Sequence, residues 1–246
     1  MQRFTDKVAI ITGASRGIGL ATAHRIVAEG GRVVLTGRKP ETLQDAVEAL
    51  GADRASAVAG KVDDPAHREE VFAHVAERYG RLDHLVNNAG INPAWGPVLE
   101  IEPSVVRKIL DVNVVAALEW TRDAVAAGLS TSIVNTSSIS GTSTSPNIAF
   151  YGVSKAALIN LTAQLAQELA PRLRVNAVAP AVVKTKLSRA LYESREEEVA
   201  AGYPLGRLGV PDDVAGPVAF LLSDDAAWIT GQTLRIDGGA SVVPVG

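Results

Sequence analysis

The sequence predicts an α/β fold, because short β-branched runs alternate with longer amphipathic segments along nearly the whole chain. The apolar runs are continuous rather than alternating, which is typical of strands buried on both faces of a parallel sheet. No linker, low-complexity tract or internal repeat divides the 246 residues. We therefore expect a single Rossmann-like, doubly wound domain over residues 1–246, with a central parallel sheet of about seven strands and helices on both faces.

The expected strands are rich in valine, isoleucine and alanine and cover residues 7–12, 32–36, 55–60, 83–88, 130–138, 174–180 and 233–237. The expected helices have apolar residues at helical spacing and cover residues 18–29, 41–50, 66–79, 103–127 and 151–169. Residues 184–211 break this alternation with a polar piece that contains three consecutive glutamates, interpreted as a solvated helix face. Long connections in compact domains are often functional, so this segment is a candidate substrate flap.

Composition excludes several classes of protein. Hydrophobic residues make up 47% and charged residues 21%, as in soluble globular proteins, and the net charge of −3 lacks the basic excess of a nucleic-acid binder. The chain has no cysteine, which excludes disulfides and fits a cytoplasmic location. Neither a signal peptide nor an apolar run long enough to span a bilayer is recognisable, so no membrane partner is expected. The four histidines show no i, i+4 pair, so no metal site is expected.

A glycine-rich turn joins the first expected strand to the first expected helix. Gly13, Gly17 and Gly19 follow the spacing G-x-x-x-G-x-G. Glycine lets the backbone turn sharply and approach a pyrophosphate closely, and the free N–H groups at a helix start favour the phosphate charge. Placed between a strand and a helix, this turn predicts a dinucleotide site.

The end of the second strand indicates which dinucleotide binds. Gly37 stands where an acidic residue would bind the ribose 2′-OH of NAD, and Arg38 and Lys39 follow it. Arg16 lies within the glycine turn and approaches the same pocket from the other side. Arginine matches the geometry of a phosphate, so these residues predict NADP(H) as the cofactor.

Tyr151 and Lys155 are four residues apart and therefore share one face of a helix. A free tyrosine has a pKa of about 10. A nearby ammonium favours the phenolate and lowers that pKa toward the range useful for general acid–base catalysis. A tyrosine and a lysine at this spacing are common by chance, so the interpretation depends on the other motifs in the chain.

Those motifs are TGASRGIG, LVNNAG, DVN, IVNTSS, YGVSK, RVNAVAP and ITGQTLRIDGG, which occur in this order over nearly the whole chain. With them, the sequence resembles the short-chain dehydrogenase/reductase family. The resemblance implies four catalytic residues. Tyr151 would donate the proton to the carbonyl oxygen, and Lys155 would lower the tyrosine pKa and hold the nicotinamide ribose. Ser138 would hydrogen-bond the same oxygen, with Ser137 as the competing choice that the family spacing disfavours, and Asn113 would anchor a water that links the lysine to solvent.

The resemblance also implies a set of cofactor-binding residues in the glycine turn, at the ends of the strands and in the LVNNAG motif. They are Gly13, Ser15, Arg16, Gly17, Ile18, Gly19, Arg38, Val62, Asn88, Ala89, Gly90, Pro180, Val183 and Thr185. Two departures affect this set. Ala181 replaces the usual glycine after Pro180, so that loop can run differently. Lys61 stands where an acidic residue or asparagine usually contacts the adenine, so only the Val62 backbone contact carries over, with Asp63 as a substitute.

The predicted enzyme reduces a ketone to a secondary alcohol, with a 3-oxoacyl thioester as the favoured substrate and another class of carbonyl compound as the alternative. Similarity is greatest to 3-oxoacyl reductases, whose substrates are thioesters of acyl carrier protein or CoA, and Arg172 and Arg174 are candidates to meet such a carrier. A third departure opposes this class, because residues 124–132 lack the basic residues expected for an acidic carrier.

Residues 92–98 and 184–192 look more like carbonyl, retinal and dicarbonyl reductases, with Trp95, Leu191 and Tyr192 as an apolar wall. A non-catalytic NADP-binding regulatory protein is a remote third possibility, disfavoured because all four catalytic residues are present. The resemblance also implies a homotetramer paired through the helices expected at residues 103–127 and 151–169.

Overall fold

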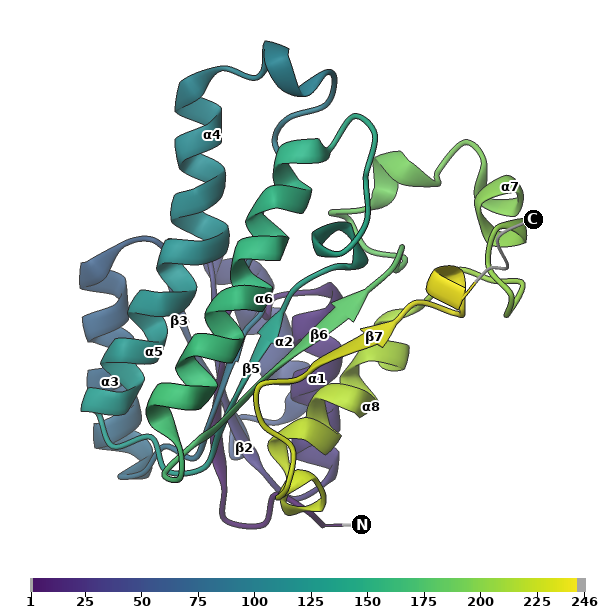
Figure 1. Ribbon diagram of the computed structural model, residues 1–246. Coiled ribbons are helices and arrows are strands. Elements are labelled where there is room, and N and C mark those ends of the chain that lie inside the picture. Colours follow the sequence, from purple (N-terminus) through teal and green to yellow (C-terminus); the bar gives the residue numbers. More distant parts are fainter. Residues whose placement is uncertain (1, 243–246) are drawn as a thin grey trace.

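The computed structural model describes residues 2–242 and confirms the α/β fold (Figure 1). All strands of the sheet run parallel, in the order β3-β2-β1-β4-β5-β6-β7. The strands are β1 Val8–Ile11, β2 Arg32–Gly37, β3 Ala55–Ala59, β4 His84–Asn87, β5 Ser132–Thr136, β6 Arg174–Pro180 and β7 Thr233–Ile236. Each apolar run of the sequence therefore forms a strand, although several strands are shorter than the runs that predict them.

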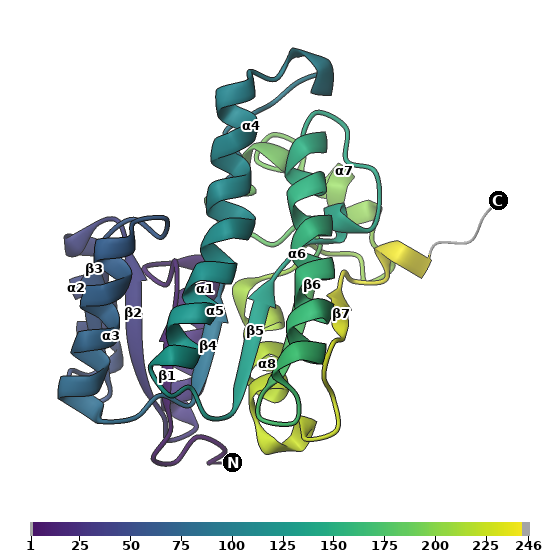
Figure 2. The ribbon, with the colours of Figure 1, turned by 60° about the vertical axis from the view of Figure 1, so that its left-hand side comes forward.

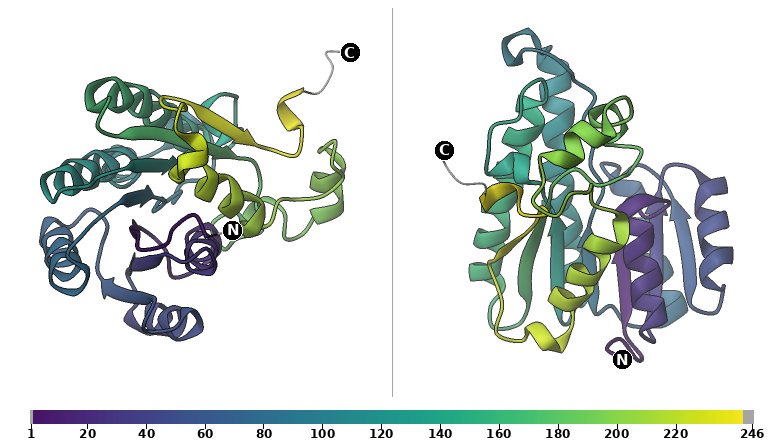
Figure 3. Two further views of the ribbon diagram at one scale, coloured as in Figure 1. Left: turned by 90° about the horizontal axis from the view of Figure 1, so that it is seen from below. Right: turned by 90° about the vertical axis from the view of Figure 1, so that its right-hand side faces the viewer.

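Helices cover both faces of the sheet (Figures 2 and 3). One layer consists of α1 Gly17–Ala28, α2 Pro40–Leu50 and α8 Pro211–Leu222, and the other consists of α3 Pro65–Tyr79, α4 Pro103–Leu110, α5 Ala116–Ala126 and α6 Ala149–Leu169. Each layer buries its own apolar cluster against the strands. None of the helices within residues 2–242 is long and apolar enough to cross a membrane.

The helix expected over residues 103–127 is interrupted by a different helical geometry. Residues Asp111–Val115, between α4 and α5, form a π-helical segment. Such segments widen a helix by one residue locally and occur often at functional sites. The segment contains Asn113 of the DVN motif, so it bears directly on the predicted catalytic group.

The strand order places a crevice at the carboxyl ends of β1 and β4. The chain leaves β1 toward β2 and β3 on one side of the sheet, and it continues to β4 and β5 on the other. Helices that connect these strands diverge at this point, which is where ligands bind in open α/β sheets. The glycine turn, the LVNNAG motif and the end of β5 all meet at this edge.

The candidate flap at residues 184–211 is an extended connection with two short helical pieces, a 3-10 turn at Arg189–Leu191 and α7 at Glu196–Ala201. A bridge between Val183 and Gly209 closes its base. The three glutamates of α7 are exposed, as the solvated-face interpretation expects, and Glu196 pairs with Lys184. Figure 1 shows α7 standing away from the sheet, at the upper right of the view.

Candidate active site

A cavity of about 730 Å³ occupies the crevice at the carboxyl ends of the strands. Every predicted cofactor-binding residue except Gly19 lines it, namely Gly13, Ser15, Arg16, Gly17, Ile18, Arg38, Val62, Asn88, Ala89, Gly90, Pro180, Val183 and Thr185. Three of the four predicted catalytic residues, Ser138, Tyr151 and Lys155, line the same cavity. The fold thus gathers residues that are up to 172 positions apart, from Gly13 to Thr185, around one space.

The glycines of the first turn serve two different purposes. Gly13 and Gly17 adopt φ values of +64° and +59°, which L side chains rarely adopt, so the turn itself requires glycine. Gly19 lies outside the cavity lining, because its missing side chain makes room for the Asn88 amide, 2.6 Å from where a Cβ would stand. Gly19 therefore has a packing role behind the turn, and its contact with the cofactor stays a prediction.

Thr12, which is outside the predicted set, joins the glycine turn to the LVNNAG motif. Its Oγ1 accepts hydrogen bonds from the backbone N–H groups of Asn88 at 2.9 Å and Ala89 at 3.0 Å. The Asn88 side chain in turn donates to the carbonyls of Thr12 at 2.9 Å and Gly13 at 3.2 Å. A threonine at the end of a buried strand, directly before the first glycine, is the only sequence signal for this contact.

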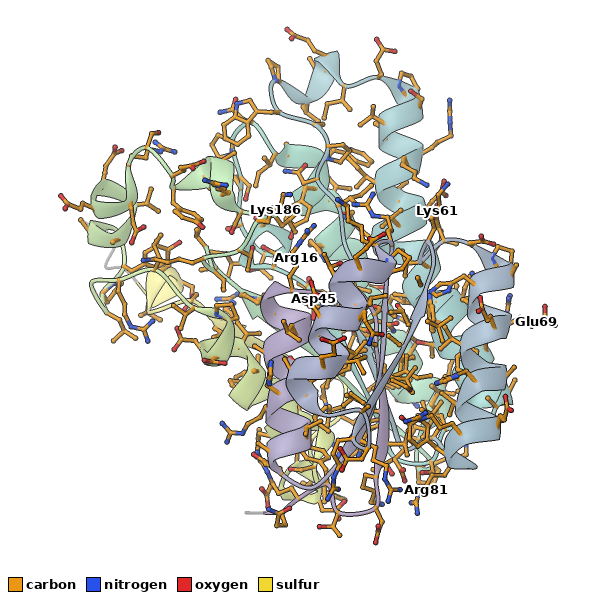
Figure 4. The ribbon with its side chains drawn as sticks, turned by 180° about the vertical axis from the view of Figure 1, so that it is seen from behind. Arg16, Asp45, Lys61, Glu69, Arg81 and Lys186 are labelled. Carbon is orange, nitrogen blue, oxygen red and sulfur yellow. The ribbon has the colours of Figure 1, made fainter. Side chains whose placement is uncertain are left out.

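The cavity is strongly basic. Six basic side chains line it and one acidic side chain does, the basic ones being Arg16, Arg38, Lys61, Lys108, Lys155 and Lys186. The one acid, Asp63, forms an ion pair with Lys108 and does not offset the others. Figure 4 shows Arg16, Lys61 and Lys186 on the same side of the molecule, whereas Arg81 lies at the opposite end of the sheet. This charge distribution suits a ligand that carries several phosphate charges.

Tyr151 and Lys155 extend from the first two turns of α6, as their spacing predicts. The Lys155 side chain is buried, and its Nζ donates to the Thr136 carbonyl at 2.7 Å and lies 5.6 Å from the centre of the Tyr151 ring. Burial lowers the pKa of Lys155 to about 8. The ammonium is thus held by the end of β5, beside the phenol.

The pKa of Tyr151 lies above its usual value, although a nearby ammonium by itself would lower it. Burial raises the pKa of Tyr151 to about 12, against a smaller lowering by a hydrogen bond with the Ser138 side chain. The Lys155 ammonium faces the ring and the Thr136 carbonyl, which leaves desolvation of the phenolate as the larger effect. Tyr151 therefore keeps its proton throughout the neutral range.

Ser138 and Ser137 occupy different environments at the end of β5. The Ser137 hydroxyl is buried and donates to the Lys155 carbonyl at 2.9 Å, so it anchors α6. Both serines line the cavity, but the Ser138 hydroxyl accepts from the Ser140 N–H at 3.2 Å, donates to the Pro180 carbonyl at 3.4 Å and forms a hydrogen bond with the Tyr151 side chain. Of the two serines, Ser138 is the one placed beside Tyr151.

Asn113 does not line the cavity but supports it from the π-helical segment. It is buried, with its Oδ1 accepting from the Ile91 N–H at 2.8 Å and its Nδ2 donating to the Ile91 carbonyl at 3.0 Å and to Ser154 Oγ at 3.0 Å. A Cβ on Gly90 would lie 3.4 Å from Lys155 Nζ and 3.5 Å from Asn113 Oδ1. Asn113 therefore fixes the loop that separates it from Lys155.

A second cavity of about 400 Å³ adjoins the first and shares Ser138 and Tyr151 with it. The predicted substrate residues Trp95 and Leu191 line it, whereas Tyr192 does not. Its other apolar lining residues are Ile139, Pro146, Ile148, Ala181, Val182 and Leu187. A group bound here would lie beside Ser138 and Tyr151.

Two departures from the family pattern are resolved by the structure. Asp6 and Asn147 are the only non-glycine residues with positive φ in the described part of the chain, so Ala181 fits its loop without backbone strain. Its N–H donates to the Ile236 carbonyl at 3.0 Å. Lys61 extends the basic lining of the cavity, and Asp63 does not replace the usual acid because Lys108 binds it.

Arg174, one of the two arginines considered for a carrier, is bound within the fold. Its guanidinium donates to the carbonyls of Leu221 at 2.7 Å, Leu222 at 3.0 Å and Ser223 at 2.9 Å, at the C-terminal end of α8. These bonds fill the free acceptors that every helix end leaves. Arg172, by contrast, is exposed.

Two polar atoms of the lining indicate that the basic cavity suits a polar ligand. Thr136 Oγ1 and Asn92 Oδ1 are buried and have no hydrogen-bond partner among residues 2–242. Buried polar groups are nearly always paired, so such atoms are expected to meet a bound group. Together with the glycine turn and the basic lining, they fit a nicotinamide dinucleotide. The fold and this site define a dinucleotide-dependent oxidoreductase.

Comparisons with known proteins agree with that class. Residues 13–241 match the family model described as enoyl-(acyl carrier protein) reductase. The chain is 40% identical to "Dehydrogenase/reductase SDR family member 4" of Caenorhabditis elegans, covering 97% of this chain and 96% of the relative. It is 39% identical to "Tropinone reductase-like 3" of Erythroxylum coca, covering 97% and 94%.

A crystal structure of a short-chain dehydrogenase/reductase from Brucella melitensis, titled glucose/ribitol dehydrogenase, superposes with a TM-score of 0.92 at 32% identity, covering 97% of this chain and 98% of that one. The protein belongs to the short-chain dehydrogenase/reductase family, which confirms the resemblance. It is an oxidoreductase that acts on CH–OH or C=O groups with a nicotinamide dinucleotide.

Proposed function

We propose that the protein is an NADPH-dependent reductase that converts an apolar ketone or aldehyde to the alcohol. The observation that carries the choice of cofactor is the lining of the larger cavity, where six basic side chains accompany one acid that is already paired. Gly37, at the end of β2, leaves no carboxylate to repel a 2′-phosphate. Arg16 and Arg38 are the residues proposed to hold it.

The proposed mechanism gives each side chain of the predicted catalytic group a task. When bound, NADPH supplies the hydride. Tyr151 holds its proton at neutral pH and donates it to the carbonyl oxygen as negative charge develops there, because an alkoxide is a stronger base than a phenolate. Ser138 Oγ donates a hydrogen bond to the same oxygen and orients the carbonyl. The Lys155 ammonium stabilises the phenolate left behind until a proton from solvent restores it.

The second cavity supports an apolar carbonyl compound as the substrate. Its lining combines Trp95, Leu187 and Leu191 with a single charged residue, Arg195. Burial of apolar surface contributes about 25 cal/mol per Å², so this wall favours an apolar group next to the carbonyl. The name of the plant relative, a tropinone reductase-like protein, is consistent with a ketone substrate.

A 3-oxoacyl thioester of CoA or acyl carrier protein is the second candidate. The description of the matching family model, which refers to acyl carrier protein, favours it. Of the two arginines considered for a carrier, Arg172 is exposed and Arg174 is committed to α8. A carrier would therefore have fewer basic contacts than the sequence suggests.

Steady-state reduction of an apolar diketone and of acetoacetyl-CoA, each with NADPH and with NADH, tests the proposal. Faster turnover of the diketone with NADPH is the expected result. Preference for acetoacetyl-CoA would move the assignment to the second candidate, and equal use of NADH would overturn the choice of cofactor. Tyr151→Phe is expected to lose at least 10²-fold in turnover while it still binds cofactor. Unchanged turnover would exclude the mechanism, and absent turnover in the wild type with intact binding would favour a regulatory protein.

We also propose a homotetramer located in the cytoplasm. Val115, Leu118 and Val153 are 46%, 41% and 52% exposed on the helices expected to pair, in the π-helical segment, α5 and α6. Apolar side chains at such positions are typical of subunit interfaces. Sedimentation velocity tests this directly, since a monomer at micromolar concentration would remove the proposal.

A further inference from the structure

Lys61 and Arg38 are neighbours at the carboxyl edge of the sheet. The parallel register pairs Gly37 of β2 with Ala59 of β3, and the Gly60 N–H continues the ladder with a 2.9 Å bond to the Gly37 carbonyl. Arg38 follows Gly37 and Lys61 follows Gly60, so both residues leave adjacent strand ends. Both line the 730 Å³ cavity.

The backbone around Lys61 is held from beneath. A Cβ on Gly60 would stand 2.2 Å from Cγ of His67, whose ring is buried against Trp120 with centroids 5.8 Å apart. On the other side, Trp120 Nε1 donates to the Val62 carbonyl at 2.9 Å. These contacts fill the space below the loop, so the exposed Lys61 side chain extends toward the cavity.

Lys61 forms no ion pair among residues 2–242. Its charge helps to lower the pKa of Asp63, but the carboxylate of Asp63 is bound by Lys108. Arg16 reaches the cavity from the glycine turn, and Figure 4 shows it on the same side of the molecule as Lys61. Three cations from three separate segments thus line the same cavity.

We propose that Lys61 completes a three-cation site with Arg16 and Arg38 for the 2′-phosphate of the cofactor. The inference rests on the proposed use of NADPH and assigns a specificity role to the position at which the family usually has an acid or an asparagine. A phosphate monoester carries a charge of about −1.5 to −2 near neutral pH. Two arginines neutralise this charge, and the third cation makes the site selectively attractive for it over an unphosphorylated ribose.

Isothermal titration calorimetry of the full chain with 2′,5′-ADP and with ADP separates this role from catalysis. Lys61→Gln is expected to weaken 2′,5′-ADP binding on the order of tenfold, which equals about 1.4 kcal/mol, and to leave ADP binding within about twofold. Lys39→Gln is the matched control, since Lys39 is an exposed cation next to Arg38 that does not line the cavity. Its binding of both nucleotides should stay within about twofold of the wild type.

The possible outcomes are distinct. Lys61→Gln protein that binds 2′,5′-ADP as tightly as the wild type would overturn the three-cation site, while a wild-type preference for 2′,5′-ADP would still support NADPH. If Lys61→Gln weakens the binding of both nucleotides equally, Lys61 contacts the adenine or supports the loop. That result would also overturn the three-cation site. A wild type that shows no preference would instead refute the proposed cofactor. Lys61→Arg keeps the charge and is expected to retain the preference.

Discussion

Replacing Gly19 by alanine is expected to destabilise the protein and to weaken dinucleotide binding at the same time. Gly19 is the third residue of α1, and an added Cβ would lie 2.6 Å from Asn88 Nδ2, 2.8 Å from the Gly13 oxygen and 2.9 Å from Ala14 Cα. Two of these atoms belong to the backbone of the glycine turn, so the turn itself must move. The Asn88 amide must also leave the carbonyls to which it donates.

The magnitude follows from opposing contributions. Overpacking of this kind costs about 1–3 kcal/mol, and each lost hydrogen bond costs about 1 kcal/mol. Alanine in a helix is favoured over glycine by about 0.5–1 kcal/mol, which offsets part of the loss. The net effect of Gly19→Ala is then about 2 kcal/mol. For a chain of this size that corresponds to a decrease in melting temperature of about 4–8 °C.

Gly216→Ala is the matched control because Gly216 lies inside α8 with open space around it. The nearest atom to its added Cβ is Arg25 Nη1, at 3.9 Å. Pro217 follows Gly216 and crowds the Cβ of a preceding helical residue, which offsets the helix preference of alanine, so this variant should stay within about 1 kcal/mol of the wild type. Thermal unfolding followed by circular dichroism, with calorimetry of 2′,5′-ADP binding, compares the two. If Gly19→Ala melts at or above the wild-type temperature, the packing argument is refuted.

Three further predictions concern Arg174, His84 and Lys155. Arg174→Gln is expected to lower the free energy of unfolding in urea by about 2–4 kcal/mol, because the guanidinium binds three carbonyls at the end of α8; a change below 0.5 kcal/mol would contradict this. Burial lowers the pKa of His84 to about 3, so the unfolded chain binds a proton that the folded one does not as the pH falls from about 6.5 to 3. The free energy of unfolding should decrease over that interval by up to about 1.4 kcal/mol per pH unit. For His84→Gln, measured at the same pH values, the free energy of unfolding should depend less steeply on pH. Carbonyl reduction should slow as the pH rises through about 8, where Lys155 loses its charge; Lys155→Arg keeps its charge, so the same decline in that variant would refute the assignment.

The sequence predicts the sheet well because strands buried on both faces consist of continuous apolar runs. It predicts the ends of the strands less well. The run at 130–138 is one example. β5 ends at Thr136 because the Ser137 hydroxyl bonds to α6 and Ser138 begins the next turn. A pattern of β-branched residues predicts neither of these hydrogen bonds. The π-helical segment at Asp111–Val115 is similarly hidden, since one extra residue per turn needs no particular side chain.

The type of a charged residue predicts its function only when its structural environment is also known. Arg38 and Arg174 both follow or begin a strand, and a sequence pattern treats them alike. The structure separates them, because Arg38 lines an open basic cavity whereas α8 surrounds the guanidinium of Arg174 with carbonyls. The packing of α8 depends on residues near position 220, about 45 positions further along the chain, and spacing does not encode that contact.

The pKa of Tyr151 shifts in the direction opposite to the one predicted from the sequence, which shows how the surroundings of a residue affect the mechanism. The Tyr-x-x-x-Lys spacing correctly places the two side chains together, but the sign of the pKa shift depends on the competition between burial and the ammonium. With the ammonium bound to the Thr136 carbonyl, burial prevails and the pKa of Tyr151 rises to about 12. A phenol that keeps its proton at pH 7 is ready to donate it to a carbonyl, whereas oxidation of an alcohol needs the phenolate to accept one. Across the neutral range, the site is therefore better prepared for reduction than for oxidation.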